Sequence, residues 1–171
     1  MTTKKLSLLG ILGAVSLVLG LFESILLPDI PFLPVGAKPG LSNVVTMYTA
    51  SIMGFPGAVY ITLIKAVFAL VTRGTTAGFM SFCGGLLSTA IVCMLIKSRG
   101  RIFSFLGIGV AGAVMHNFGQ LIAACVISGT FALLNYGKYL LIFAVITGTV
   151  TGSMLLILMP RLSKIGSQLN M

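Results

Sequence analysis

Acidic residues are almost absent from this chain: Glu23 and Asp29 are the only two among 171 residues. Clustered carboxylates are needed to hold Mg²⁺ on a diphosphate substrate, so this chain cannot form the paired aspartate clusters of a self-sufficient prenyl-transfer enzyme. The pattern GxxxxGK[ST] is also missing, which excludes a recognisable phosphate loop for ATP. We therefore expect no enzyme, and any active transport would need another subunit.

Metal-binding and redox patterns are equally scarce. The chain has one histidine and three cysteines, Cys83, Cys93 and Cys125, none of which shows CxxC spacing. Each cysteine lies in an apolar stretch with no neighbouring histidine, where a thiol packs as a small hydrophobic group. We therefore expect no metal site and no cofactor.

Apolar residues, in contrast, make up 57 % of the chain, in runs long enough to cross a bilayer. This composition predicts an all-α integral membrane protein whose residues 1–171 form one transmembrane domain, a bundle of six helices. The six predicted spans are Leu6 to Leu27, Leu41 to Gly54, Pro56 to Thr72, Thr76 to Ile96, Ile102 to Ser128 and Tyr139 to Met159. The second and third are short for a bilayer, but the Gly54-Phe55-Pro56-Gly57 sequence between them is a strong helix break.

The net charge of +9 reflects orientation in the membrane rather than nucleic-acid binding, because the basic residues lie mostly at the ends of apolar runs. With six spans and a cytoplasmic N-terminus, seven basic residues are cytoplasmic (Lys4, Lys5, Lys97, Arg99, Arg101, Arg161 and Lys164) and three are external (Lys38, Arg73 and Lys138). With five spans, four are cytoplasmic and six external. The positive-inside rule therefore predicts six spans in the cell membrane, with both termini cytoplasmic and the proline-rich segment from Pro28 to Pro39 as an external cap.

Several costly polar residues fall at one depth of the predicted bundle. Lys65 precedes Arg73 by eight residues, so it lies about 12 Å below the external surface. His116, Asn117 and Gln120 lie about 12 to 18 Å below the same surface. We therefore predict a water-accessible, outward-opening pocket. Two alternatives stay open: Asn117 as a helix–helix hydrogen bond, and Lys65 extending to a lipid headgroup.

Other residues extend this predicted site toward the external end. Asn43 lies three residues into the second span, and Lys38 precedes the start of that helix, where the amide dipoles favour anions. A phosphate, diphosphate or carboxylate group would suit this end. The predicted ligand-binding set is Lys38, Asn43, Lys65, Arg73, His116, Asn117 and Gln120.

Three segments resemble one bacterial family. They are GAKPGLSN (residues 36–43), GGLLS (84–88) and AGAVMHNFGQL (111–121), of which the last is the most specific. They look like the Gx transporter family, also labelled heptaprenyl diphosphate synthase component I, and the resemblance spans most of the chain. Pro39 departs from the apolar residue that usually follows the lysine.

That family is similar in size to the substrate-binding S components of energy-coupling factor transporters. The resemblance implies a small-molecule ligand, anionic or amphiphilic, bound from outside beneath the Pro28 to Pro39 loop. It also implies that Gly10, Gly13 and Ala14 dock a transmembrane coupling subunit that works with an ATPase module. The alternative is a non-catalytic membrane accessory subunit, in prenyl diphosphate and quinone synthesis or in a membrane redox assembly.

Overall fold

The computed structural model describes residues 3–26, 40–97 and 103–168, with side chains as far as residue 160. The described residues form α1 (Thr3–Leu26), α2 (Leu41–Arg73), α3 (Thr75–Lys97), α4 (Phe105–Ser128), the short 3-10 helix η1 (Phe131–Tyr136) and α5 (Gly137–Gln168). The predicted all-α class is confirmed. Five of these helices are long and apolar enough to cross a bilayer, as expected of a multi-pass membrane protein.

The described residues form five long helices rather than the expected six, because the second and third predicted spans are joined in α2 with a single non-helical residue, Gly54, between them. The predicted break is confined to Gly54, whose φ of 69° and ψ of −162° lie in a region that glycine alone adopts readily. Pro56 does not extend the break into a loop, since proline is tolerated in the first turn of a helix, where its missing N–H has no partner to lose. The helix therefore resumes directly after Gly54.

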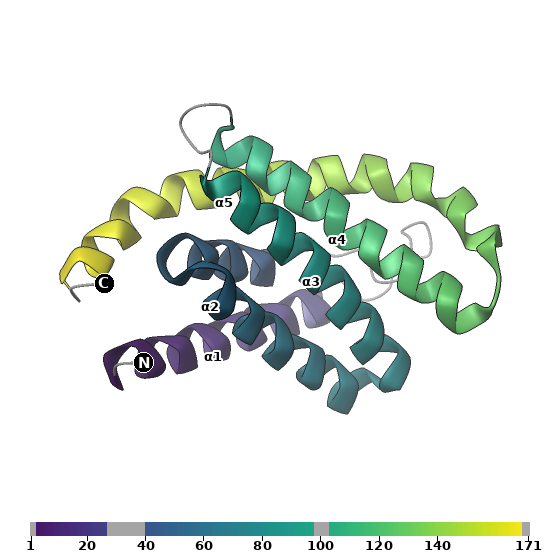
Figure 1. The fold of residues 1–171 in the computed structure, drawn as a ribbon, viewed down its shortest axis with the longest axis horizontal. Helices are drawn as coiled ribbons and strands as arrows, with labels where there is room; N and C mark the ends of the chain where they lie inside the picture. Colours follow the sequence, from purple (N-terminus) through teal and green to yellow (C-terminus); the bar gives the residue numbers. More distant parts are fainter. Residues whose placement is uncertain (1–2, 27–39, 98–102, 169–171) are drawn as a thin grey trace.

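The chain nevertheless changes direction at Gly54. Lys65 donates a hydrogen bond to Asn43, although the two would be about 33 Å apart in a straight helix. The two halves of α2, residues 41–53 and 55–73, therefore lie side by side, as Figure 1 shows. With this reversal, the start of α1 and the end of α5 lie at the same end of the bundle (Figure 1). The side of the membrane on which this end lies stays a prediction.

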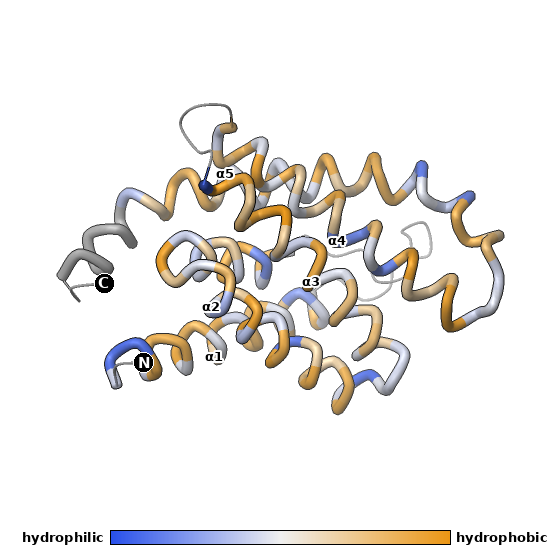
Figure 2. Tube along the Cα trace, in the orientation of Figure 1, coloured by the Kyte–Doolittle hydropathy of each residue, from blue (hydrophilic) through white to orange (hydrophobic). Residues whose placement is uncertain are grey.

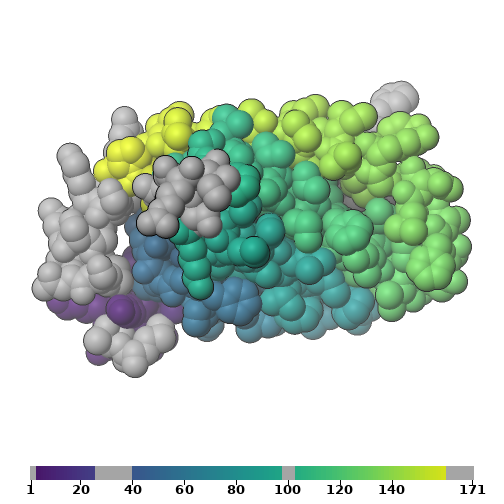
Figure 3. All heavy atoms as spheres, turned by 45° about the horizontal axis from the view of Figure 1, so that its top comes forward, coloured from purple at the N-terminus to yellow at the C-terminus, as the bar shows by residue number. Residues whose placement is uncertain are grey.

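Helices α2, α3, α4 and α5 pack in a ring around one apolar core, and α1 lies outside this ring. Among the described elements, α1 packs only on α2, whereas α3 lies between α2 and α4, and α5 packs on α4 and α2. The space-filling view shows α3, α4 and α5 covering most of one face (Figure 3). Ile61, Ile108 and Leu155 are the largest fully buried apolar side chains.

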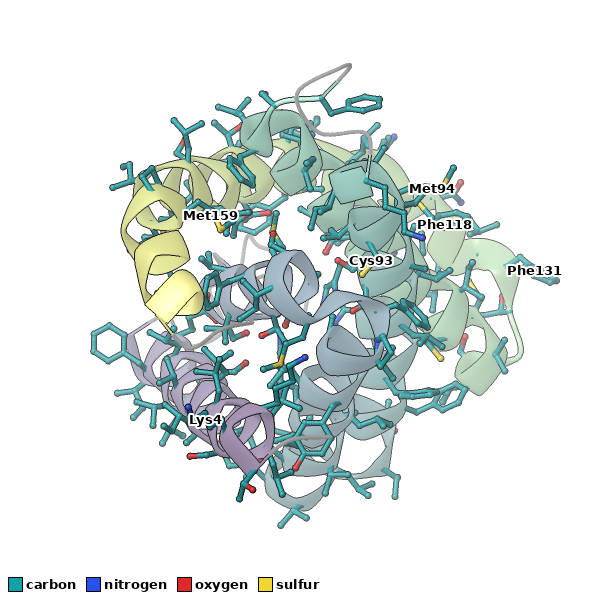
Figure 4. The ribbon with its side chains drawn as sticks, turned by 60° about the vertical axis from the view of Figure 1, so that its left-hand side comes forward. Lys4, Cys93, Met94, Phe118, Phe131 and Met159 are labelled. Carbon is teal, nitrogen blue, oxygen red and sulfur yellow. The ribbon has the colours of Figure 1, made fainter. Side chains whose placement is uncertain are left out.

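Large apolar side chains cover the outside of the bundle, as a lipid environment requires. The hydropathy colouring is apolar along most of each helix (Figure 2). Met94, Phe118 and Phe131 point outward, whereas Cys93 points inward (Figure 4). Cys93 belongs to the buried apolar cluster and Cys125 is also buried, which agrees with their predicted packing role.

Candidate functional site

Lys65 lies inside the bundle because α2 folds back on itself. Its side chain is half-buried, and its Nζ donates to Asn43 Oδ1 at 2.6 Å across the two halves of the helix. An ammonium group has three N–H donors, so two remain after this bond. A cation with free donors in a membrane interior is costly and is therefore a candidate functional group.

A polar cavity surrounds this ammonium group. Its lining comes from both halves of α2, from one face of α3 and from α4: Asn43, Thr46, Met47, Ala50, Thr62, Lys65, Ser81, Gly85, Ser88, Thr89, Val92 and His116. Its empty volume is about 370 Å³ including the open mouth, but the centre of a water molecule can occupy only about 20 Å³. In this form the cavity therefore holds about one or two waters or a small chemical group.

His116 contributes the second titratable side chain of the cavity. Its Nδ1 is buried and has no hydrogen-bond partner in the described part of the chain. Such a group is expensive to leave unsatisfied, so its presence favours a bound water or ligand.

Glycines bring α4 close enough to α3 for His116 to reach the cavity. A Cβ atom on Gly84 would lie 2.7 Å from the His116 carbonyl oxygen. One on Gly119 would lie 2.8 Å from the Cα of Gly84. Glycine is therefore required at both positions for this close approach.

Two threonines form the deeper polar contact between α2 and α3. The hydroxyl groups of Thr62 and Thr89 are 2.9 Å apart, and Thr62 also donates to the Ala58 carbonyl at 3.0 Å. Thr89 must therefore donate to Thr62, which leaves Thr89 with free acceptor capacity. Both side chains are almost fully buried, so this pair holds the cavity wall in place.

The structure brings together Asn43, Lys65 and His116 from the predicted site, but places other members elsewhere. Asn117 donates to the Leu140 carbonyl at 3.1 Å and links α4 to α5, which agrees with its alternative interpretation. Gln120 packs against Gly84 of α3, outside the cavity lining. Arg73 is exposed at the end of α2.

Lys38 and the Pro28 to Pro39 loop lie outside the described residues. A direct role for these residues in ligand binding stays a prediction. The same holds for the binding roles of the residues that the cavity brings together.

Glu23 was missed as a candidate, although it is an acid inside a predicted span. It is only 3 % exposed, and its Oε1 accepts a hydrogen bond from the Leu41 backbone N–H at 2.6 Å. It thus satisfies a free donor at the first turn of α2. Glu23 also lies within electrostatic range of Lys65. The sequence could have indicated Glu23, since every ionisable residue in a membrane span is a candidate functional residue.

The small residues of α1 divide between two faces. Gly10 and Ala14 are exposed, and no atom lies within 4 Å of a Cβ built on Gly10. Gly13 is buried, with the Ile64 side chain 3.2 Å from the corresponding Cβ position. Gly13 therefore serves packing within the bundle, and the outward small-residue face consists of Gly10 and Ala14.

These features define a multi-pass α-helical membrane protein with a polar cavity between α2, α3 and α4. Residues 12–158 match the family described as heptaprenyl diphosphate synthase component I. The chain belongs to this family, as its three sequence segments indicated. No curated protein and no solved structure matches the chain.

Proposed function

We propose that this chain is a membrane-embedded binding subunit of a small-molecule transporter, with the ligand held in the cavity around Lys65. The observation that carries this proposal is a half-buried lysine whose ammonium group and a neighbouring His116 nitrogen both lack hydrogen-bond partners among the described residues, apart from the Lys65 bond to Asn43. No carboxylate lines the cavity among the described residues, so the lining favours a ligand rich in acceptors or negatively charged.

In the proposed transporter, this chain binds the ligand and other subunits supply the energy for uptake. The sequence has no phosphate loop, so uptake against a gradient requires a separate ATPase module and a transmembrane coupling subunit. Gly10 and Ala14 offer the coupling subunit a flat outward face on α1. In the proposed orientation both termini are cytoplasmic and the cavity opens toward the external end, where α2 begins.

A second function is favoured by the family description itself. The family is described as component I of a heptaprenyl diphosphate synthase, which suggests an accessory subunit of an enzyme assembly. With two acidic residues in the whole chain, such a subunit would be non-catalytic. The polar residues would then act as structural hydrogen bonds rather than as a ligand site.

Native mass spectrometry of the purified protein separates these two functions. We expect a bound small molecule at one copy per chain, which is lost in Lys65→Met and retained in Lys138→Met. The control removes the same charge from an exposed position. A ligand-free chain that forms a stable complex with a soluble synthase subunit would instead establish the accessory role.

The docking face is tested separately from the cavity. Gly10→Leu and Ala14→Leu should weaken the complex with the coupling subunit and leave the co-purified ligand in place, because both positions are exposed on α1 and neither lines the cavity. If these replacements removed the ligand and left the complex with the coupling subunit unchanged, the proposed separation of docking face and ligand cavity would be wrong.

A further inference from the structure

Helix α1 contributes none of the described residues of the cavity lining, yet it holds the helix turn next to that lining. Three residues on one face of α1 contact the start of α2: Ser16, Gly20 and Glu23. Glu23 Oε1 accepts from the Leu41 N–H at 2.6 Å, and the Ser16 hydroxyl donates to the Ser42 carbonyl at 3.3 Å. Because α1 packs only on α2 among the described elements, any influence of α1 on the cavity passes through α2.

Glu23 supplies a helix cap that the start of α2 does not provide itself. Gly40 precedes the helix and has no side chain to accept a hydrogen bond from the first turn. Its φ of 82° lies in the left-handed region, which glycine adopts without strain. The Leu41 N–H is instead satisfied from α1, by a carboxylate that is only 3 % exposed. The position of the first turn therefore depends on a neighbouring helix.

Asn43 connects this first turn to the cavity. It lies two residues after Leu41, and its backbone N–H donates to the Gly40 carbonyl at 2.8 Å. Its side-chain Oδ1 accepts a hydrogen bond from Lys65 Nζ at 2.6 Å. A lysine stem is flexible, so this bond sets the direction in which the ammonium group points. A shift of the first turn would therefore redirect Lys65.

Resting on the proposed function, we infer that Glu23 is a positioning residue for the ligand site. Its carboxylate holds the first turn of α2 against α1, and Asn43 in that turn directs the Lys65 ammonium group into the cavity. Glu23 does not line the cavity, so it acts through Asn43 rather than on the ligand. What matters at this position is an acceptor oxygen with the reach of a glutamate side chain, and not its negative charge.

The test follows the Lys65 ammonium group directly. Full-length protein labelled with ¹⁵N at lysine Nζ is placed in lipid bilayers, and its solid-state NMR spectrum is recorded. The Lys65 signal is identified by its loss in Lys65→Met, and Asn43→Ala shows where this signal lies without the hydrogen bond. Glu23→Met should move the signal toward the Asn43→Ala position. Glu23→Gln keeps an acceptor oxygen at the same reach and should leave the signal in place.

A shorter side chain separates reach from charge. Glu23→Asp keeps the carboxylate but withdraws it by one CH₂ group from the Leu41 N–H, so it should move the Lys65 signal as Glu23→Met does. This variant also keeps the inference testable if Glu23→Met does not fold. Asn117→Leu is the matched control. It removes another bond from a side chain to a backbone group, between α4 and α5, and should leave the Lys65 signal unmoved.

A cross-link tests whether Glu23 acts through position. A Cβ on Gly20 would lie 3.8 Å from the Ser42 Cβ, within the separation of about 3.5 to 4.5 Å found in disulfides. In a background lacking the native cysteines, Gly20→Cys and Ser42→Cys should therefore form a disulfide between α1 and the start of α2. Once oxidised, this link should return the Lys65 signal of Glu23→Met to its original position, and reduction should reverse the effect.

Each other outcome overturns the inference. An unmoved Lys65 signal in Glu23→Met and Glu23→Asp would do so, as would a signal that moves equally in Glu23→Gln or in Asn117→Leu. A disulfide that forms without restoring the signal would show that Glu23 does not act through the start of α2. Native mass spectrometry of the same samples decides the proposed binding function separately, since the NMR signal requires no added ligand.

Discussion

Glycine serves two kinds of helix contact in this protein, one in which it faces backbone and one in which it faces a side chain. Between α4 and α5, a Cβ on Gly109 would lie 2.5 Å from the Gly148 carbonyl oxygen, and one on Gly148 would lie 2.5 Å from the Cα of Val110. The backbones of α4 and α5 are in direct contact there, so no space for a side chain or a ligand remains between them. Around the cavity, a Cβ on Gly85 would meet the Thr62 methyl group at 2.6 Å, beside open polar space.

The difference shows that the groups facing a glycine decide its role. Backbone atoms opposite Gly109 and Gly148 produce close packing, which stabilises helix pairs in a membrane where no hydrophobic driving force exists between them. Gly85 faces the side chain of Thr62 in the wall of a cavity, where Lys65 keeps N–H donors that have no partner among the described residues. We therefore expect the interface between α4 and α5 to serve packing alone, and the proposed ligand to bind in the cavity.

Gly148→Ala should have the largest effect on stability, because the new methyl group meets the α4 backbone, which cannot move as a side chain can. We expect a loss of about 1 to 3 kcal/mol, measured as a lower midpoint of thermal unfolding. Gly10→Ala is the matched control, since no atom lies within 4 Å of its Cβ position. Equal midpoints for both variants would contradict the close contact between α4 and α5.

Gly85→Ala should reduce ligand binding more than stability. Its Cβ displaces the side chain of Thr62 and narrows the cavity, so the co-purified ligand should be lost, while the unfolding midpoint should fall less than in Gly148→Ala because a side chain and not the backbone must move. Gly107→Ala is the control outside the cavity, where the nearest atom to the new Cβ is 3.8 Å away. Unchanged ligand content in Gly85→Ala would argue against the cavity as the site.

Asn117→Leu should have the smallest effect. It removes the hydrogen bond to the Leu140 carbonyl, and such bonds between membrane helices contribute about 0.6 kcal/mol on average. The unfolding midpoint should therefore fall slightly, with ligand content unchanged. Loss of the ligand would return Asn117 to the binding set and remove the distinction between the two interfaces.

The sequence predicted the membrane class and most helix positions, because long apolar runs carry that signal without tertiary information. It also predicted a break at Gly54, but not that one residue suffices for the reversal. Glycine can adopt the backbone angles of a one-residue reversal, but it can equally adopt the angles of a longer loop. The sequence therefore does not give the length of the connection between the two halves of α2. For this reason the expected count of six helices was wrong, although the two halves of α2 run in opposite directions.

The candidate site was predictable in part. Depth along each span selected Lys65 and His116 correctly as neighbours, since rise per residue is fixed in a helix. Depth does not give rotation about the helix axis, so Asn117 and Gln120 were grouped with them but face α5 and α3. Glu23 was missed because its partner is a backbone N–H, which no side-chain pattern in the sequence reveals.

Water access to the two interfaces tests the central assignment most directly. In a variant lacking the native cysteines, Ser88→Cys places a thiol in the cavity, and Thr147→Cys places one at a buried position of α5. Thiols react as thiolates, which require water, so methyl methanethiosulfonate should modify Ser88→Cys and leave Thr147→Cys unmodified, as read by intact-protein mass spectrometry. Equal modification of both, or an unreactive Ser88→Cys beside a modified Thr147→Cys, would contradict the assignment of the ligand site to the Lys65 cavity.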